Sequence, residues 1–141
     1  MSENDVNEMN RGVIAQMRAN DGKVLEGRFA GSDLLLLTTK GAKSGQTRTN
    51  PLMYLRDGDR YVIFASRNGG PKHPDWYFNL VANPDVELEV KGERLPATAS
   101  VPEGEEAERV WSQCIELRPF LADMRQKALP RRLPLVLLEP A

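Results

Sequence analysis

The chain has 141 residues, of which 40% are apolar and 28% are charged, and its formal net charge at pH 7 is −1. This length and composition are typical of one soluble globular domain spanning residues 1–141. The near-neutral charge argues against a general nucleic-acid-binding protein, which is normally basic. One cysteine and one histidine are too few for a structural zinc site or a multi-histidine centre, so we expect no bound metal.

The sequence lacks the features that would direct a chain to a membrane or an oxidising compartment. Residues 1–5 are polar and acidic, unlike a secretory signal peptide. No apolar run approaches the roughly 20 residues that a membrane-spanning helix requires. Cys114 cannot form an internal disulfide, which fits a reducing compartment. The sequence therefore predicts a cytoplasmic protein without an integral membrane segment.

The first predicted element in chain order is an amphipathic helix over residues 5–18, within an N-terminal segment 1–20. Its apolar side chains recur at helical spacing and are Val6, Met9, Val13, Ile14 and Met17. Residues 20–23 predict a turn, and residues 24–33 carry no clear pattern. Leu34–Thr39 is apolar without alternation, which indicates a strand buried on both faces.

The next segment, Gly41–Leu52, contains glycines and hydroxyl side chains and is predicted to be a loop between two strands. It brings two cations, Lys43 and Arg48, together with hydroxyls such as that of Ser44. Residues 34–56 hold four cations and no carboxylate. An arginine fork and glycine N–H groups that turn toward one point both favour an oxyanion such as phosphate.

This loop does not match the P-loop of a nucleotide hydrolase. A Walker sequence requires G-x-x-x-x-G-K-[ST] at the start of a helix. Here one residue separates Gly41 from Lys43, and Pro51 leads into strand-like sequence. We therefore expect a phosphate that is held for positioning rather than transferred.

The remainder of the chain alternates strands with short helices. Predicted strands span residues 52–56 and 61–66, joined by a hairpin turn at 57–60, and then 86–90, 94–101 and 133–138. Predicted helices span residues 74–81 and 105–117, and a short segment at 120–126 follows Pro119. Two hairpins and a closing strand, with helices between them, give an α+β fold around a mainly antiparallel sheet.

The two most reactive side chains of the sequence are expected to be structural. Cys114 lies on the apolar stripe of the helix 105–117, which indicates a core position. His73 lies in a turn-like run of glycine and proline, which is typical of an exposed loop residue rather than a catalytic base. If the protein is an enzyme, an external cofactor then carries the chemistry.

Three motifs, in this order and spacing, identify a family. They are Gly41-x-Lys43-Ser44-Gly45-x-x-Arg48-x-Asn50-Pro51-Leu52, then Ala65-Ser66-Arg67-x-Gly69-Gly70, and then His73-Pro74-x-Trp76-Tyr77-x-Asn79-Leu80-x-Ala82-Asn83-Pro84. Together they closely resemble the deazaflavin-dependent nitroreductase family of actinobacteria. The resemblance implies a split β-barrel over residues 34–140, related to flavin-reductase and FMN-binding barrels, with flanking helices. It also implies the use of reduced coenzyme F420, an 8-hydroxy-5-deazaflavin with a phosphate and an oligoglutamate tail.

The resemblance further implies which residues hold this cofactor. They are Ala42, Lys43, Ser44, Arg48, Pro51, Leu52, Phe64, Ala65, Ser66, Arg67, Asp75, Trp76 and Asn79. Lys43, Ser44 and Arg48 fall on the family's phosphate-binding positions, residues 64–67 pass along the deazaflavin ring, and the short helix closes over it. The acidic tail of the cofactor is complementary in charge to residues 34–74. This segment has seven cations and two carboxylates, a net charge of +5, against −6 for the remainder of the chain.

The positions that line the acceptor pocket differ from those of the family's best-known members. Tyrosines of those members are matched here by Arg118, Leu121 and Met124, and Met53 stands where some members carry tyrosine. We expect Met53, Leu121 and Met124 to contact the substrate. These side chains are apolar and have no hydroxyl donor, so conjugated lactones and enones should be reduced better than bicyclic nitroimidazoles.

The expected activity is the transfer of a hydride from reduced deazaflavin to an electron-poor small molecule, such as an unsaturated lactone or other activated alkene, a quinone or a nitroaromatic. Ser66 either donates a hydrogen bond to the acceptor carbonyl or only holds the ring, and both roles stay open. Two alternatives are an FMN-dependent reductase on the same barrel and a deazaflavin carrier that catalyses nothing. The sequence indicates no particular oligomeric state.

Overall fold

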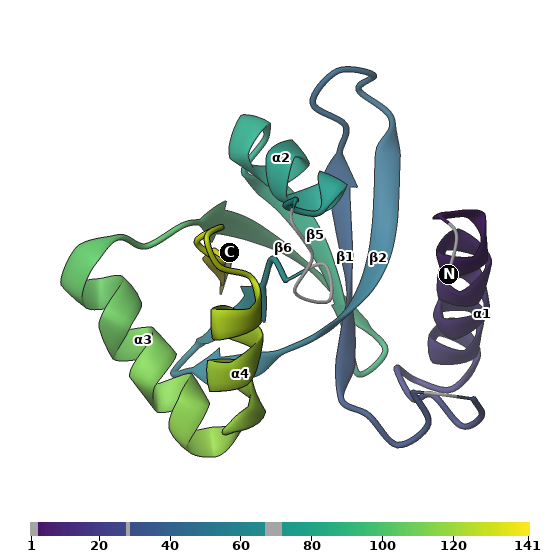
Figure 1. Ribbon diagram of the computed structural model, residues 1–141. Coiled ribbons are helices and arrows are strands. Elements are labelled where there is room, and N and C mark those ends of the chain that lie inside the picture. Colours follow the sequence, from purple (N-terminus) through teal and green to yellow (C-terminus); the bar gives the residue numbers. More distant parts are fainter. Residues whose placement is uncertain (1–2, 28, 67–71) are drawn as a thin grey trace.

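The computed structural model of the chain describes residues 3–27, 29–66 and 72–141, with side chains from Glu8 onward in those ranges. The elements in chain order are α1 Glu3–Ala19, β1 Leu34–Lys40, β2 Thr47–Met53, β3 Leu55–Asp57, β4 Arg60–Phe64, α2 Asp75–Ala82, β5 Asp85–Val90, β6 Glu93–Ser100, α3 Gly104–Leu117, α4 Phe120–Lys127 and β7 Leu135–Pro140. Figure 1 shows α1 on one side of the sheet, α3 and α4 on the other, and α2 beside the upper part of β1.

The seven strands form one antiparallel sheet in the order β2-β1-β5-β6-β7-β4-β3. Its two edge strands, β2 and β3, are consecutive in the chain and are separated only by Tyr54. Two residues of extended chain span at most roughly 7 Å, so the two edges must meet at this point. The sheet therefore curls into a split β-barrel, as the family resemblance implies.

The first core cluster fills the inside of the barrel. It includes Leu35 and Leu37 of β1 and Trp76 of α2. Leu34 and Leu36 alternate with them along β1 and pack on the outer face against α1. The strand is therefore buried on both faces, which confirms the prediction from its unbroken leucine run.

A second cluster, here called the outer cluster, packs α3 and α4 against the outer face of β4 and β7. It includes Phe64 of β4, Leu121 of α4 and Leu135 of β7. Val110, Trp111 and Cys114 form the buried stripe of α3, as the helical spacing predicts. Burial raises the pKa of the Cys114 thiol to about 11, so the thiol stays protonated at neutral pH. Cys114 is a core residue in this structure.

One segment predicted as a loop is a strand. Thr47–Pro51 pairs with β1 as part of β2, so the turn between these strands is confined to residues 41–46. Thr38 and Thr49 face each other across the pair with their Oγ1 atoms 2.8 Å apart, and β-branched pairs of this kind favour a strand. Pro51 is tolerated because β2 is an edge strand.

Other boundaries differ from the prediction by a few residues. The predicted strand 52–56 is divided at Tyr54, where the chain passes from one edge of the sheet to the other. The last strand spans residues 135–140 instead of 133–138, and the segment after Pro119 is the helix α4. Within the described ranges, no helix has both the length and the apolar character needed to span a bilayer.

Candidate functional site

The turn between β1 and β2 is held by its own backbone. The Gly41 N–H donates to the Gln46 carbonyl over 2.7 Å, and the Gly45 N–H donates to the Gly41 carbonyl over 3.1 Å. Gly45 has a φ of 71°, a left-handed conformation that glycine adopts without steric cost. The Gln46 N–H donates to the Ser44 hydroxyl oxygen over 3.2 Å. These bonds give the turn a defined shape.

The same bonds change the expected anion site. The N–H groups of Gly41, Gly45 and Gln46 are used inside the turn, and the Ala42 N–H donates to Asn79 Oδ1 over 3.1 Å. The expected convergence of glycine N–H groups on one anion therefore does not form in this structure. An anion at the turn must be held mainly by side chains.

Three exposed cations surround the turn, namely Lys40, Lys43 and Arg48. The Arg48 guanidinium makes a long contact of 3.4 Å to the side-chain oxygen of Gln46, its one hydrogen bond to a described residue. Among the described residues, none of the three cations has a carboxylate at ion-pair distance. Neighbouring cations without carboxylates produce a positive potential. This donor set fits a phosphate and an acidic tail.

Two asparagines tie α2 to this turn. Asn79 accepts the Ala42 N–H and donates from Nδ2 to Thr39 Oγ1 over 3.3 Å. Asn83, directly after the helix, donates to the Lys40 carbonyl over 3.3 Å. The predicted phosphate-binding turn and the predicted closing helix are therefore one connected unit.

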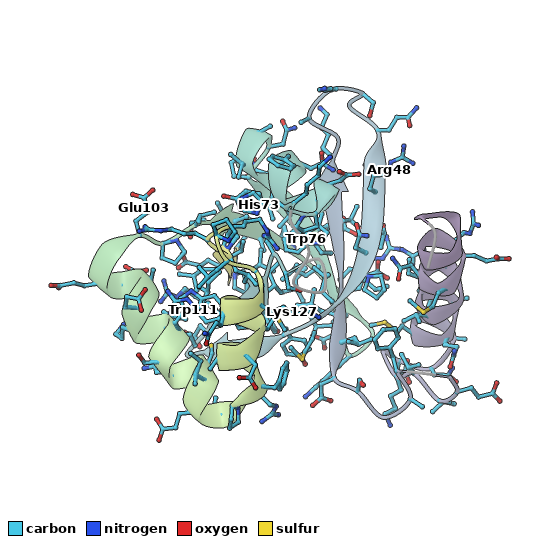
Figure 2. All side chains as sticks on the ribbon, viewed as in Figure 1. Arg48, His73, Trp76, Glu103, Trp111 and Lys127 are labelled. Atoms are coloured by element: carbon cyan, nitrogen blue, oxygen red, sulfur yellow. The ribbon has the colours of Figure 1, made fainter. Side chains whose placement is uncertain are left out.

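Part of the predicted ring-binding surface lies on the inner face of the barrel. Ala65 and Trp76 are 0% and 6% exposed, and Leu52 packs against the same inner cluster. Figure 2 shows Trp76 between α2 and the sheet, with Trp111 on the α3 side. Ser66 is half-buried just after β4, and Asp75 is exposed at the first position of α2. The remaining predicted residue of this segment, at position 67, lies outside the described residues.

Two predicted cofactor-binding side chains point to outer faces. Phe64 packs on Trp111 beneath α3, with ring centroids 5.2 Å apart. Pro51 pairs with Leu36, whose side chain packs against α1, and paired residues share a face. A motif places a residue along the chain but does not say which face of a strand it occupies. Phe64 and Pro51 can meet a ligand inside the barrel only through their backbone.

The three residues expected to contact the acceptor come together in the outer cluster beneath α3 and α4. Leu121 belongs to it, and Met53 and Met124 pack against it. Leu121 is 0% exposed, so it fills the core and offers no surface to a ligand here. Met53 and Met124 are half-buried. Of the three, only the methionines keep accessible surface, because Leu121 lies on the inward face of α4.

His73 is not the exposed loop residue that the sequence predicts. Its ring is half-buried and packs on Tyr77 and Phe78, with centroids 4.8 and 5.7 Å apart. Its Nδ1 atom lies 2.7 Å from Arg131 Nη1. Burial, followed by the Arg131 charge, lowers the pKa of His73 below its ordinary value. The imidazole is therefore neutral at neutral pH.

Arg131 is a residue of this region that sequence reasoning missed. Its Nη1 donates to the Ala65 carbonyl over 2.9 Å, and its Nη2 donates to the Ser66 carbonyl over 2.7 Å. It lies about 65 positions away in the chain, so no motif or spacing connects it to β4. The basic pair before the last strand was the only signal, and it does not identify a partner.

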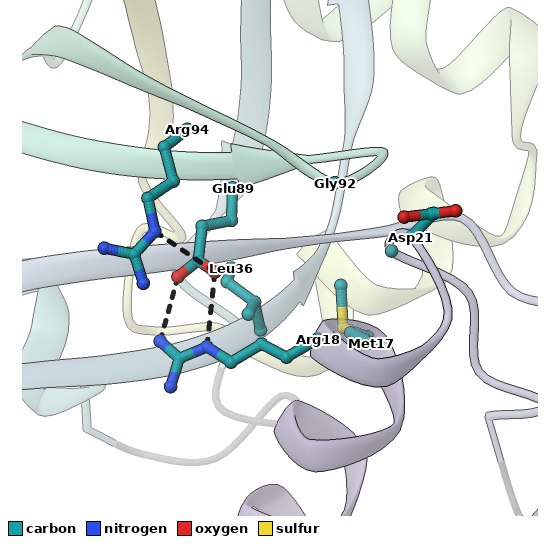
Figure 3. Close-up of a pocket in the computed structure, with 8 residues that line it drawn as sticks. Met17, Arg18, Asp21, Leu36, Glu89, Gly92 and Arg94 are labelled. Atoms are coloured by element: carbon teal, nitrogen blue, oxygen red, sulfur yellow. Dashed lines mark hydrogen bonds and ion pairs between the residues drawn. The ribbon is translucent and has the colours of Figure 1, made fainter.

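Two surface hollows lie elsewhere on the barrel. One of about 290 Å³ lies between α1 and the β5–β6 hairpin, where Glu89 contacts both Arg18 and Arg94 (Figure 3). The other, of about 430 Å³, is lined in part by Tyr54 and Tyr61. Among the described residues that line them, neither hollow includes one expected to bind the cofactor. The candidate site is the turn between β1 and β2 together with α2, which Asn79 and Asn83 join by hydrogen bonds.

Comparison with known proteins gives consistent matches. A family described as F420H(2)-dependent quinone reductase matches residues 9–140. An F420H(2)-dependent quinone reductase of Mycobacterium tuberculosis (strain H37Rv) is 43% identical over 106 residues, which cover 74% of this chain and 71% of that relative. The solved structure of an F420-H2 dependent reductase, FDR-A, is 42% identical with a TM-score of 0.67, covering 76% of this chain and 94% of that one. A solved chain described as a domain-swapped dimer is 37% identical with a TM-score of 0.69, covering 98% and 100%.

The family match covers every strand of the barrel, and α2, α3 and α4 as well. It therefore includes the cationic turn and the helix that is hydrogen-bonded to it. The cation set around the turn has the charge that the phosphate and acidic tail of the family's cofactor require. The chain belongs to the F420H(2)-dependent quinone reductase family, and its cofactor is reduced coenzyme F420.

Proposed function

We propose that this reductase transfers a hydride from reduced coenzyme F420 to electron-poor organic acceptors, with quinones as the main class. The observation that carries the proposal is the cationic turn 41–46 docked on α2 through Asn79. When bound, the reduced deazaflavin supplies the hydride. The tasks of the protein are then to bind the cofactor, orient the two reactants and exclude water.

Lys43 and Arg48 are proposed to bind the phosphate from either side of the turn. The Ser44 oxygen accepts a hydrogen bond from the Gln46 N–H, so its own proton is free to be donated to an anion. Lys40 is exposed beside them and can pair with the acidic tail. These residues would hold the cofactor by its charged end.

The buried pair Ala65 and Trp76 is proposed to support the ring end of the cofactor. Both side chains belong to the inner cluster, which excludes water from that part of the barrel. Ser66 is half-buried next to them, where its hydroxyl can donate to an acceptor carbonyl or to the ring. Either contact orients one reactant for hydride transfer without a further catalytic group.

The acceptor class follows first from the activity named for relatives, and second from two methionines of the outer cluster, on the other face of the sheet from Ala65 and Trp76. Met53 and Met124 keep part of their surface and adapt to flat apolar molecules. Neither can donate a hydrogen bond to a nitro group, and discrimination of that kind depends on such donors. We propose that quinones, conjugated lactones and enones are reduced better than bicyclic nitroimidazoles, with other nitroaromatics also accepted slowly.

Stopped-flow mixing tests this function. Protein with reduced F420 is mixed with a naphthoquinone, an unsaturated lactone and a bicyclic nitroimidazole, and kcat/KM is ranked for the three acceptors. We expect cofactor oxidation with the naphthoquinone and the slowest turnover with the nitroimidazole. Turnover with NADPH plus FMN, and none with reduced F420, would support the FMN-dependent alternative. Tight F420 binding without oxidation by any acceptor would support the carrier alternative.

A further inference from the structure

Three separate segments of the chain meet at the guanidinium of Arg131. They are the end of β4, His73 just before α2, and the connection from α4 to β7, which carries Arg131 itself. The fork donates to the carbonyls of Ala65 and Ser66, and Nη1 also lies 2.7 Å from His73 Nδ1. An arginine in contact with three acceptors on two segments has little freedom to move.

The first two contacts lie where β4 leaves the sheet. The register of β4 with β7 ends at Phe64 opposite Leu135, and the Ala65 N–H still donates to the Pro134 carbonyl over 3.0 Å. This is the last described backbone hydrogen bond between the end of β4 and the chain before β7. The Arg131 fork takes the carbonyls of Ala65 and Ser66 and so sets the course of the backbone at the predicted ring-binding position.

The third contact determines the tautomer of His73. A guanidinium is a donor only, so the Nδ1 atom that it approaches must be the unprotonated acceptor. A neutral imidazole with an acceptor at Nδ1 carries its proton on Nε2. Protonation of Nδ1 would place two cations 2.7 Å apart, which explains why the Arg131 charge lowers the pKa of His73.

His73 also connects Arg131 to α2. Its ring packs on Tyr77 and Phe78 of that helix. The other end of α2 is held by Asn79 and Asn83, which bond to the β1–β2 hairpin. α2 is therefore fixed at both ends, and Arg131 alone joins its N-terminal end to the end of β4 among the hydrogen bonds of the described residues.

We propose that Arg131 is a positioning residue that sets the distance between the end of β4 and α2, and thereby the width of the slot for the deazaflavin ring. This inference rests on the proposed function, because the slot matters only if the ring lies between these two segments. Arg131 acts through Ala65, Ser66 and His73 and does not itself need to touch the cofactor. The neighbouring Arg132 is exposed and offers a control with the same charge.

The first test needs no cofactor and uses the fact that the chain has one histidine. The 15N spectrum of labelled protein should show a neutral imidazole with the proton on Nε2. In Arg131→Gln the second tautomer should appear and the pKa of His73 should rise toward its ordinary value, whereas Arg132→Gln should match the wild type. An Nδ1–H tautomer in the wild type, or an unchanged pKa in Arg131→Gln, would show that the contact does not hold His73.

The second test measures two quantities that the slot width should control. The F420 Kd is measured by titration, and the hydride-transfer rate is measured by single-turnover oxidation at saturating F420. In Arg131→Gln we expect an F420 Kd about tenfold higher and a hydride-transfer rate lower by on the order of tenfold, because the ring is no longer held in register. Arg131→Lys keeps the charge but not the fork and should recover only part of both losses. Arg132→Gln should change neither quantity.

The outcomes separate the two proposals. A folded Arg131→Gln variant with wild-type Kd and wild-type rate would overturn the positioning role while the proposed function stands. Full recovery in Arg131→Lys would also contradict it, since charge alone would then suffice. Failure of the wild type to bind F420 would overturn the proposed function, and the positioning role with it. A lower melting temperature with an unchanged rate at saturation would indicate a structural role only.

Discussion

Two groups of cations in this protein differ in whether a carboxylate lies next to them. Asp57 contacts Arg60 and Arg109, and the Arg60 hydrogen bond lowers the pKa of that carboxyl most. The Asp57 side chain is only 14% exposed, so these arginines are held by a partly buried carboxylate. Lys43 and Arg48 have no carboxylate partner among the described residues, and they lie at the turn that Asn79 of α2 contacts through Ala42. Cations of the second kind are available for an anionic ligand.

Arg48→Ala tests the phosphate contact at the level of one residue. Loss of a charge-assisted hydrogen bond should weaken F420 binding by about 1.5–3 kcal/mol, measured by fluorescence titration. Arg11→Ala is the matched control, because Arg11 is an exposed arginine on α1. Equal F420 affinities for the wild type and a folded Arg48→Ala protein would show that Arg48 does not bind the cofactor, contrary to the proposed role of the turn.

Leu121→Ala tests whether that residue belongs to the core or to the acceptor pocket. Since Leu121 is 0% exposed in the outer cluster, truncation should lower the free energy of unfolding by about 2–5 kcal/mol in urea titrations. The KM for a naphthoquinone should stay close to the wild-type value in the folded fraction. A large change in KM with little loss of stability would show that Leu121 contacts the acceptor.

At the scale of elements, α1 is attached to the barrel by packing and by a charged contact. Arg18 donates two hydrogen bonds to Glu89 of β5, at 3.2 and 2.9 Å. The turn after α1 lies directly against the β5–β6 turn, where a Cβ on Gly22 would be 2.8 Å from Lys91 Cα. Gly22 also has a φ of 87°, so both its backbone conformation and the close approach require glycine.

The attachment of α1 should weaken in acid. The Arg18 hydrogen bond lowers the pKa of Glu89 below its ordinary value of 4.5. A carboxyl with a lowered folded pKa contributes stability above its unfolded pKa, and this contribution is lost as the pH falls through the folded value. Glu89→Gln should therefore be less stable than the wild type at pH 7, by about 0.5–1 kcal/mol.

The measurement is urea unfolding of both proteins from pH 7 down to pH 3. The two stability curves should converge as the pH falls from the ordinary glutamate value through the lowered folded value, because Glu89 then becomes neutral in the folded protein as well. A constant gap across this range would mean that the carboxylate charge does not hold α1.

At the scale of the whole molecule, the two edges of the sheet meet at Tyr54, and three exposed cations gather around the turn between β1 and β2. The helices, the buried β1 strand and the hairpins follow from periodicity and turn residues, so the sequence predicts them. Which way Phe64 and Pro51 point, and which groups Arg131 meets, depend on register and on contacts distant in the chain. No local pattern encodes these features, which is why they emerge only from the structure.

The central claim is that the cationic turn and α2 bind F420 through its charged end. The most direct test is an equilibrium titration of the wild-type protein with F420, with the deazaflavin headgroup lacking phosphate and tail, and with FMN, at low and high salt. Charge attraction is screened by salt, so F420 should bind most tightly and lose affinity as salt rises, while the headgroup should bind weakly with little salt dependence. Equal, salt-independent affinities for F420 and its headgroup, or tighter binding of FMN than of F420, would contradict the account.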